Sequence, residues 1–274
     1  YWPVFVLPTL IAFAIAFILP FVIGLYLSFC DFTTITNATF TGFENYKTAF
    51  AAGQNFLYSF SFTALFTVIS IVTVNVIAFV LAYFLTKKLK GTNFFRTVFF
   101  MPNLIGGIVL GYIWQILLNG ILGHFGRTLT YSSSYGFWGL IILMNWQQVG
   151  YMMIIYIAGI QNIPGELIEA AKMDGASNWQ LLKSVTIPMV MPSITICTFL
   201  TLTNSFKLFD QNLALTAGEP SNNSQMLALN IFETFYGRTG WEGVGQAKAV
   251  IFFIIVAVIA LAQNRLTRTK EVQQ

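Results

Sequence analysis

The hydrophobic positions of this sequence gather in long apolar runs that are separated by shorter polar segments. A bilayer core of roughly 30 Å needs about 20 apolar residues in a helix, and six runs reach or approach this length. They cover approximately residues 4–29, 57–85, 98–118, 137–160, 188–206 and 249–261, and the last is the shortest. The pattern predicts an all-α, polytopic membrane protein with six transmembrane helices, in one domain over residues 1–274.

Composition supports a membrane environment. Hydrophobic residues make up 56% of the chain and charged residues 9%, against about 25% charged residues in an ordinary soluble domain. A soluble fold of this size cannot hide so much apolar surface. The formal net charge is only +4, so we do not expect nucleic acid as a partner. The chain begins at Tyr1 rather than Met, and we expect a short polar segment to precede it.

Lysine and arginine are distributed unequally between the two sides of the expected membrane, which sets the orientation. One side carries Lys87, Lys88, Lys90, Arg96, Lys172, Lys183, Arg265, Arg268 and Lys270; the other carries Lys47, Arg127, Lys207, Arg238 and Lys248. We therefore expect the first side, with both chain termini, to be cytoplasmic. The outer segments are then 31–56, 119–135 and 207–248, and residues 225–236 read as a short amphipathic helix.

The six runs carry no ionisable residue at their centres, whereas proton-coupled carriers place such groups in the membrane. They do contain amides and hydroxyls: Asn75, Asn103, Gln115, Asn145, Gln147, Gln148, Tyr151, Asn204 and Ser205. Beside aromatic rings, such groups suit an uncharged polyhydroxyl ligand. The alternative is that they hydrogen-bond neighbouring helices. The sequence leaves both interpretations open.

Small residues and prolines predict local features of two runs. Gly107 and Gly111 form a G-x-x-x-G pair, which favours close helix approach. Pro8 and Pro20 lie in the first run, where we expect kinks because proline lacks the backbone N–H.

Signals for catalysis are missing from the sequence. It has no G-x-x-x-x-G-K-[ST], no G-x-S-x-G and no H-E-x-x-H. His124 is the only histidine, and Cys30 and Cys197 are the only cysteines. We expect two buried thiols, no metal site and no catalytic residues.

The segment between the fourth and fifth runs predicts two short helices joined by a turn. Pro164 suits a first helical turn, and Gly175 suits a left-handed helix end. Ser177 is a plausible N-cap of the second helix, which carries Trp179. Pro188 is expected to open the fifth span. The segment fits either an amphipathic hairpin on the membrane surface or a peg that docks into another protein.

This segment also resembles the signature of the inner-membrane permeases of binding-protein-dependent ABC importers, E-A-A, three residues, G, nine residues, then I-x-L-P. The chain has Glu169-Ala170-Ala171, Gly175 and Val185-Thr186-Ile187-Pro188, and Asp174-Gly175-Ala176 is the form common in the carbohydrate branch. Two further segments are similar to those of maltose- and glycerol-phosphate-type subunits: Phe40–Tyr46, and Ser205–Asp210 followed by Thr216–Pro220, with Glu219 in place of a glycine.

The resemblance implies a type I importer permease in a bacterial or archaeal cytoplasmic membrane. Its expected partners are a second, homologous permease, an ABC ATPase dimer, an extracellular or periplasmic solute-binding protein and a sugar, with ATP and Mg on the ATPase and no cofactor on this chain. ATPase coupling falls to the loop 163–187, through Glu169, Ala170, Ala171, Asp174, Gly175 and Ala176. The implied substrate path comprises Gln147, Gln148, Tyr151, Asn204, Ser205 and Lys207.

Three alternatives compete with this interpretation. A stand-alone secondary carrier or channel leaves the loop 163–187 unexplained. A membrane scaffold or intramembrane enzyme needs a domain or catalytic pair that the sequence lacks. An importer of another small polar solute, such as glycerol phosphate, needs a basic residue on the path, and Lys207 is the candidate.

Overall fold

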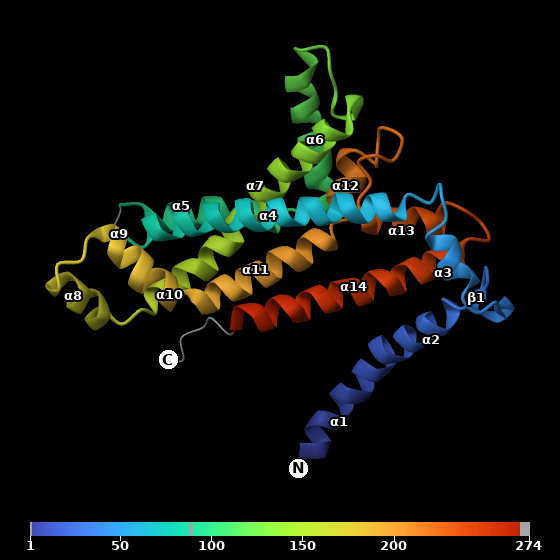
Figure 1. Cartoon of the computed structure of the whole chain (residues 1–274), viewed down its shortest axis with the longest axis horizontal. Helices are drawn as coiled ribbons and strands as arrows, with labels where there is room; N and C mark the ends of the chain where they lie inside the picture. Colours follow the sequence, from blue (N-terminus) through green and yellow to red (C-terminus); the bar gives the residue numbers. More distant parts are fainter. Residues whose placement is uncertain (1, 88–89, 269–274) are drawn as a thin grey trace. The chain divides into compact units, whose positions relative to one another are not determined.

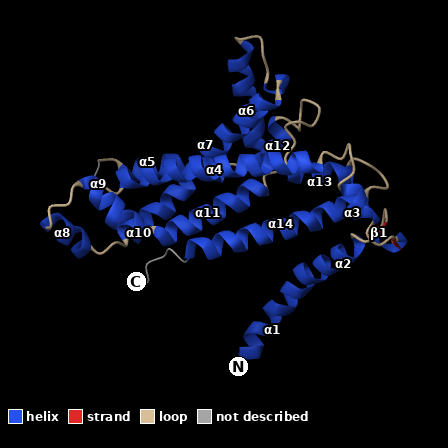
Figure 2. Cartoon of the chain, viewed as in Figure 1, coloured by secondary structure: helices blue, strands red, loops and turns tan. Residues whose placement is uncertain are grey.

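The computed structural model describes residues 2–87 and 90–268. Lys88 and Lys270, two of the basic residues behind the predicted orientation, lie outside this part of the chain. The described chain is helical except for its loops and one two-residue strand pair, so the all-α expectation is confirmed (Figures 1 and 2). The chain divides into two compact units, one of residues 1–60 and 227–255 and one of residues 61–226 and 256–274. That all 274 residues form one permease domain stays a prediction.

The first unit contains the first span, the segment that follows it and the start of the last long helix. Its elements, including the two helices shared with the second unit, are α1 (Trp2–Phe13), η1 (Ala14–Ile18), α2 (Leu19–Leu27), β1 (Cys30–Asp31), η2 (Ile35–Asn37), β2 (Thr39–Phe40), α3 (Glu44–Ala49), α4 (Phe56–Leu85), α13 (Leu227–Tyr236) and α14 (Glu242–Arg268). Strands β1 and β2 pair antiparallel, Cys30 opposite Phe40.

The second unit holds the remaining helices and most of the buried apolar side chains. Its elements are α5 (Thr92–Phe100), η3 (Met101–Leu104), α6 (Gly107–Gly123), η4 (Leu129–Tyr131), α7 (Ser133–Gln161), α8 (Gly165–Met173), α9 (Asn178–Leu181), η5 (Leu182–Thr186), α10 (Ile187–Met189), α11 (Met191–Phe206) and α12 (Asp210–Leu215). Helix α7 is the central one, because α4 and α11 contribute buried side chains to the clusters around it, and α5 adds the partly buried Phe99.

Six membrane spans are compatible with the helices. Four long apolar helices qualify directly: Val4–Leu27, Phe56–Leu85, Ser133–Gln161 and Glu242–Thr267. Two bent pairs complete the set, Thr92–Leu104 with Gly107–Gly123 at 102° and Asn178–Met189 with Met191–Phe206 at 67°. The predicted count is therefore met only when each bent pair is one span.

The third span, predicted over 98–118, consists of two helices with a sharp bend between them. The helix narrows to a 3₁₀ turn at Met101–Leu104, and Ile105 and Gly106 are extended (ψ 130° and 140°) before α6 begins. Pro102 offers no N–H for a continuing helix. The chain therefore changes direction between α5 and α6 at Pro102, Ile105 and Gly106.

Two prolines follow π-helical turns. The Leu19 N–H donates to Ala14 O, and the Ile187 N–H donates to Leu182 O, five residues back in each case. Pro20 and Pro188 come next and lack the N–H of the normal ladder. The expected distortion near Pro20 is thus a π turn within one span. Pro188 does not open the fifth span, which as a bent pair of helices starts at Asn178. Pro188 lies in the first turn of α10, just before the 67° bend, and α11 follows with Pro192 in its first turn.

The motif Phe40–Tyr46 closes the C-terminal end of α2 in the first unit. Asn45 Nδ2 donates to the carbonyl oxygens of Ser28 (3.1 Å) and Cys30 (2.8 Å), and the Tyr46 hydroxyl lies 2.7 Å from Ser28 Oγ. A Cβ on Gly243 would lie 2.3 Å from Cys30 O. The motif that resembles permeases is therefore a chain reversal, and the side-chain amide of Asn45 holds it by hydrogen bonds.

The glycine pair Gly107 and Gly111 makes the close contact that its spacing predicts. A Cβ on Gly107 would lie 2.7 Å from Asp210 Cβ, and one on Gly111 would lie 2.5 Å from Ala214 Cβ. Helix α12 thus packs directly on the first turns of α6. Cys30 and Cys197 are buried free thiols, as predicted.

Candidate functional site

The loop 163–187 forms an elbow of two short helices between α7 and α11 (Figure 1). Helix α8 starts after Pro164, which lies one position before the first turn where it was expected. Gly175 is left-handed (φ +78°), as predicted. The Gly175 N–H donates to Lys172 O and the Ala176 N–H to Ala171 O, both at 3.0 Å. These bonds satisfy carbonyl groups at the end of α8.

The second half of the elbow begins at a capping box. Ser177 Oγ accepts from the Gln180 N–H (3.3 Å), and the Ser177 N–H donates to Gln180 Oε1 (2.8 Å). Ser177 is therefore the N-cap that the sequence predicts. The reciprocal bonds fix the direction in which α9 leaves the turn.

The residues assigned to ATPase coupling lie at the surface of this elbow. Glu169, Ala170, Asp174 and Gly175 are exposed, and Ala171 and Ala176 are half-buried. The small side chains let another backbone approach closely.

Apolar side chains stand out beside them. Met173 is 88% exposed and Trp179 69% exposed. Sequence reasoning missed Met173, although a methionine between Lys172 and Asp174 at a helix end is the signal that could have found it. An exposed thioether on a polar elbow indicates a surface that another molecule covers.

Three residues of the expected substrate path hydrogen-bond other residues of the second unit. Gln147 is buried; its Nε2 donates to Ile105 O (3.3 Å), and its Oε1 accepts from Gln211 Nε2 (2.8 Å). Gln148 Oε1 accepts from Asn204 Nδ2 (3.2 Å). The structure thus brings Gln148 and Asn204 together. In this state Gln147 holds the break of the third span against α12.

The remaining path residues differ in exposure. Tyr151 is half-buried, with its ring centroid 6.5 Å from that of Phe100. Ser205 is buried, and its hydroxyl finds no hydrogen-bond partner within the described chain. Lys207 is exposed directly after α11. The roles of these residues in transport stay a prediction.

Other polar side chains in the spans bond neighbouring helices, as the packing interpretation expects. The Tyr156 hydroxyl donates to Asn75 Oδ1 (2.7 Å), and Asn75 Nδ2 lies 3.3 Å from Thr201 Oγ1. Asn75 therefore joins α4, α7 and α11. Asn145 Nδ2 donates to Thr73 Oγ1 (2.9 Å) and also links α7 to α4.

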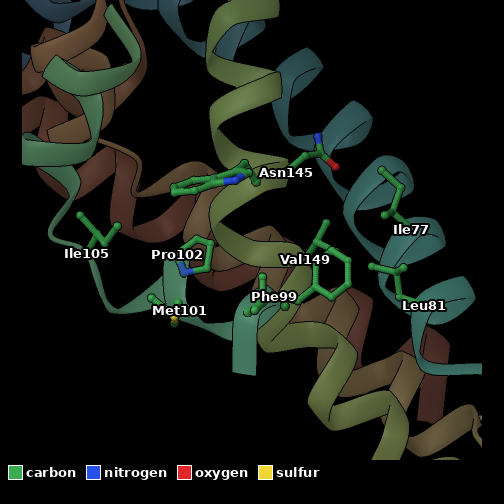
Figure 3. A pocket seen from close by; sticks show the side chains of 11 residues that line it. Ile77, Leu81, Phe99, Met101, Pro102, Ile105, Asn145 and Val149 are labelled. Atoms are coloured by element: carbon green, nitrogen blue, oxygen red, sulfur yellow. The ribbon is translucent and has the colours of Figure 1, made fainter. Parts of the chain in front are cut away.

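A cavity of about 630 Å³ lies beside the break in the third span (Figure 3). Its wall is apolar, apart from Asn145, and comes from α4, α5, η3 and α7: Ile77, Leu81, Val98, Phe99, Met101, Pro102, Ile105, Asn145, Trp146, Val149 and Gly150. Figure 3 shows the Asn145 amide directed toward Ile77 on α4. A wall of this kind lacks the convergent polar groups of a sugar site.

Lys248 is a buried cation that the sequence placed in an outer loop. It is 0% exposed within α14, which runs well beyond the predicted 249–261. Its Nζ donates to Asn230 Oδ1 (2.9 Å) and Thr234 Oγ1 (2.8 Å) on α13. These bonds offset part of the desolvation cost of the ammonium. The amphipathic helix expected at 225–236 is therefore α13, fastened to the last span inside the first unit.

Known proteins resemble the chain over its whole length. Residues 90–271 match the family described as binding-protein-dependent transport system inner membrane component. The chain is 45% identical, over 100% of its length and 95% of the relative's, to the probable starch degradation products transport system permease protein of Thermoanaerobacterium thermosulfurigenes. It is 31% identical, over 99% and 97%, to the multiple sugar-binding transport system permease protein of Streptococcus mutans.

The fold has a solved counterpart. A bacterial ABC transporter involved in the import of the acidic polysaccharide alginate contains a chain that matches with a TM-score of 0.83, at 21% identity, over 97% of this chain and 94% of that one. The spans and the exposed elbow define a membrane permease with the type I ABC importer fold. The chain belongs to the family of binding-protein-dependent transport system inner membrane components. It is therefore a membrane-embedded component of a transport system and not an enzyme in itself.

Proposed function

We propose that this chain is one permease subunit of an ATP-driven importer that moves a sugar, most simply an oligosaccharide, into the cytoplasm. The observation that carries the proposal is the exposed elbow of α8 and α9, which turns at a left-handed Gly175 beside an 88% exposed Met173. The names of the relatives support the substrate class, since they transport starch degradation products and multiple sugars.

The proposed assembly contains this chain, a second, homologous permease and an ABC ATPase dimer, which binds ATP and Mg. A solute-binding protein delivers the sugar from the extracellular or periplasmic side. The chain lies in the cytoplasmic membrane of a bacterium or archaeon with both termini inside. The alginate importer in complex with its oligosaccharide-bound periplasmic protein supports these kinds of partner.

The elbow is the proposed point of coupling. When ATP closes the ATPase dimer, the two elbows of the permease pair are drawn together, and the spans attached to them tilt. Helix α8 follows α7 and α9 leads to α11, so a displacement of the elbow reaches both helices that carry the path residues. Glu169 pairs with a basic group of the ATPase, and Gly175 permits close backbone contact.

The proposed sugar path runs from the middle of α7 to the C-terminal end of α11. The pair Gln148 and Asn204 and the half-buried Tyr151 offer amide and phenol groups and one ring face, which suits a sugar. Because the Gln148–Asn204 bond joins the two helices, entry of a sugar hydroxyl requires this bond to be exchanged. The path residues thus act as helix contacts when no sugar is present.

A matched glycine pair tests the coupling proposal. Gly175→Asp places a side chain at φ +78°, where only glycine is unstrained. Gly165→Asp adds the same carboxylate at the first residue of α8, where a Cβ meets open space and the helix dipole favours it.

We expect ATP-dependent uptake and ATPase co-purification to be lost in Gly175→Asp and kept in Gly165→Asp, with equal membrane levels of both variants. Equal uptake by the two variants would refute the elbow as the coupling point.

The path is tested by Tyr151→Ala, with Tyr151→Phe as the control. Loss of the ring removes the proposed sugar-stacking surface, so sugar uptake at limiting concentration should fall by about tenfold, the effect of roughly 1.4 kcal/mol. Stimulation of ATPase activity by the binding protein should persist. Unchanged uptake in Tyr151→Ala removes this residue from the path.

A further inference from the structure

Two hollows adjoin at the outer end of the α6–α7 hairpin in the second unit. The first, of about 590 Å³, is apolar and is lined by Ile116, Leu117, Gly120, Ile121, His124 and Phe125. The second, of about 460 Å³, is lined by Leu122, Phe125, Arg127 and Tyr135. Phe125 belongs to both walls, so an apolar groove along α6 leads to a basic and aromatic end.

The polar end is organised around one guanidinium. Arg127 donates a hydrogen bond to the Tyr135 hydroxyl, and its Cζ lies 5.3 Å from the Tyr131 ring centroid. The hydrogen bond to Tyr135 raises the pKa of Arg127, so the group stays cationic. Arg127 forms no ion pair with any residue that the structure describes. A fixed cation with an available charge therefore stands at the end of the groove.

The loop that joins α6 to α7 and carries Arg127 is closed by one buried side chain, that of Leu129, which we call the plug. Leu129 is buried, and its N–H donates to Asn119 Oδ1 (2.8 Å) at the end of α6. A Cβ on Gly139 would lie 2.9 Å from Leu129 Cδ2, so the plug fits closely against α7. The plug holds the loop with Arg127 between the two helices.

The depth of the hairpin in the membrane follows from the length of α7. Its 29 residues span about 43 Å, which matches a bilayer including its headgroups, about 40–45 Å. Tyr135 lies in its first turn, at headgroup level, and Trp138, 52% exposed, follows a turn later. Tyrosine and tryptophan are typical of this boundary. The apolar groove lies on α6, whose 17 residues form the second and longer part of the bent third span.

We propose that the two hollows bind one phospholipid of the surrounding membrane, with an acyl chain along Gly120 on α6 and the phosphate on Arg127. A planar guanidinium matches phosphate oxygens with two hydrogen bonds, and the phenols of Tyr131 and Tyr135 lie beside it. Gly120 has open space where a Cβ would be, which leaves room for the chain.

The loop 163–187 follows the opposite end of α7, so the lipid belongs to the leaflet on the far side from the coupling elbow. The proposal needs only the membrane location and does not depend on the sugar. Its failure therefore leaves the proposed transport function untouched.

Native mass spectrometry of the full chain, purified in mild detergent and incubated with palmitoyl-oleoyl phosphatidylglycerol, tests the site. We expect one retained lipid, and about tenfold weaker retention in Arg127→Gln, the loss expected for one charge-assisted contact. Gly120→Leu, which fills the groove without touching the cation, should weaken retention to a similar extent. The matched control is Arg238→Gln, since Arg238 also lies over an aromatic ring, that of Trp241 (5.2 Å), and belongs to the other unit of the chain.

Three outcomes would overturn the proposal. The first is equal lipid retention in Arg127→Gln, Gly120→Leu and the wild type, when all elute identically on size exclusion. The second is displacement of the lipid by inorganic phosphate alone, which would make the site an anion site. The third is protection of Phe125→Cys from a membrane-soluble maleimide by the second permease alone and not by lipid, which would make the groove a subunit interface.

Discussion

The sharpest test of the described packing is Gly150→Ala in α7. A Cβ at this position would lie 1.8 Å from the Phe99 carbonyl oxygen and 2.3 Å from its carbon. Both atoms belong to the backbone of α5, so no side-chain rotation relieves the contact. Ordinary contact begins near 3.4 Å, and α5 must therefore retreat from α7 by more than an ångström, beside the break at Pro102.

The magnitude follows from two opposing effects. Overpacking costs about 1–3 kcal/mol, and a backbone clash lies at the upper end. Replacing a helical glycine by alanine returns about 1 kcal/mol. We therefore expect Gly150→Ala to lower the free energy of unfolding by about 2 kcal/mol. Gly120→Ala is the matched control, because its Cβ meets open space; it should raise stability by about 0.5–1 kcal/mol.

The assay is equilibrium unfolding of the purified permease in mixed micelles, followed by tryptophan fluorescence. The two variants should move in opposite directions and differ by about 3 kcal/mol, from the overpacking and helix-propensity effects together. If Gly150→Ala were as stable as Gly120→Ala, α5 would not lie against α7 as described, and the arrangement around the break of the third span would be wrong.

Three further predictions follow from single contacts. Lys248→Met removes the ammonium that donates to Asn230 and Thr234, at a cost of about 1–3 kcal/mol for each buried hydrogen bond lost. Protease cleavage within 227–241 should therefore increase, and unchanged cleavage would show that Lys248 does not hold α13. Asn75→Leu removes the acceptor of the Tyr156 hydroxyl and should lower the free energy of unfolding by about 1–3 kcal/mol. Asn103→Leu makes the same exchange outside this group of hydrogen bonds and is the control. Ser177→Ala removes the N-cap of α9 and costs about 1 kcal/mol locally; amide exchange of α9 should quicken, and an unaltered exchange rate would show that the cap does not hold the elbow.

Hydropathy identifies the spans because the membrane demands length and apolarity and little else. The same averaging conceals shape. Residues 98–118 are apolar on average, despite Asn103 and Gln115, so the turn at Pro102 and Gly106 does not interrupt the hydropathy signal. Two residues of α7 contact the chain beside the 102° break. Gly150 packs against the Phe99 carbonyl, and Gln147 donates a hydrogen bond to the Ile105 carbonyl.

Lys248 shows the opposite error. A lysine in an apolar run was interpreted as the boundary of the span, because an unpaired cation is costly there. Its partners Asn230 and Thr234 lie on α13, which a short loop joins to the start of α14. Sequence spacing alone does not show that these acceptors converge on the ammonium.

The candidate site was predicted unevenly for a similar reason. The elbow depends on local rules, so the left-handed Gly175 and the Ser177 cap are visible in the sequence. The polar path depends on which helix each amide faces. Gln147 and Gln148 are adjacent in sequence but bond α12 and α11 respectively. Only the packing of the helices distinguishes these two partners.

The central claim is that this chain conducts sugar only under the control of an ATPase docked at α8 and α9. The most direct measurement is uptake of labelled maltodextrin into proteoliposomes that contain this chain with its second permease, ATPase and binding protein. We predict uptake that requires both internal ATP and the external binding protein, and that disappears in Gly175→Asp. Uptake by this chain alone, without ATP or the ATPase, would contradict the account and identify a carrier or channel.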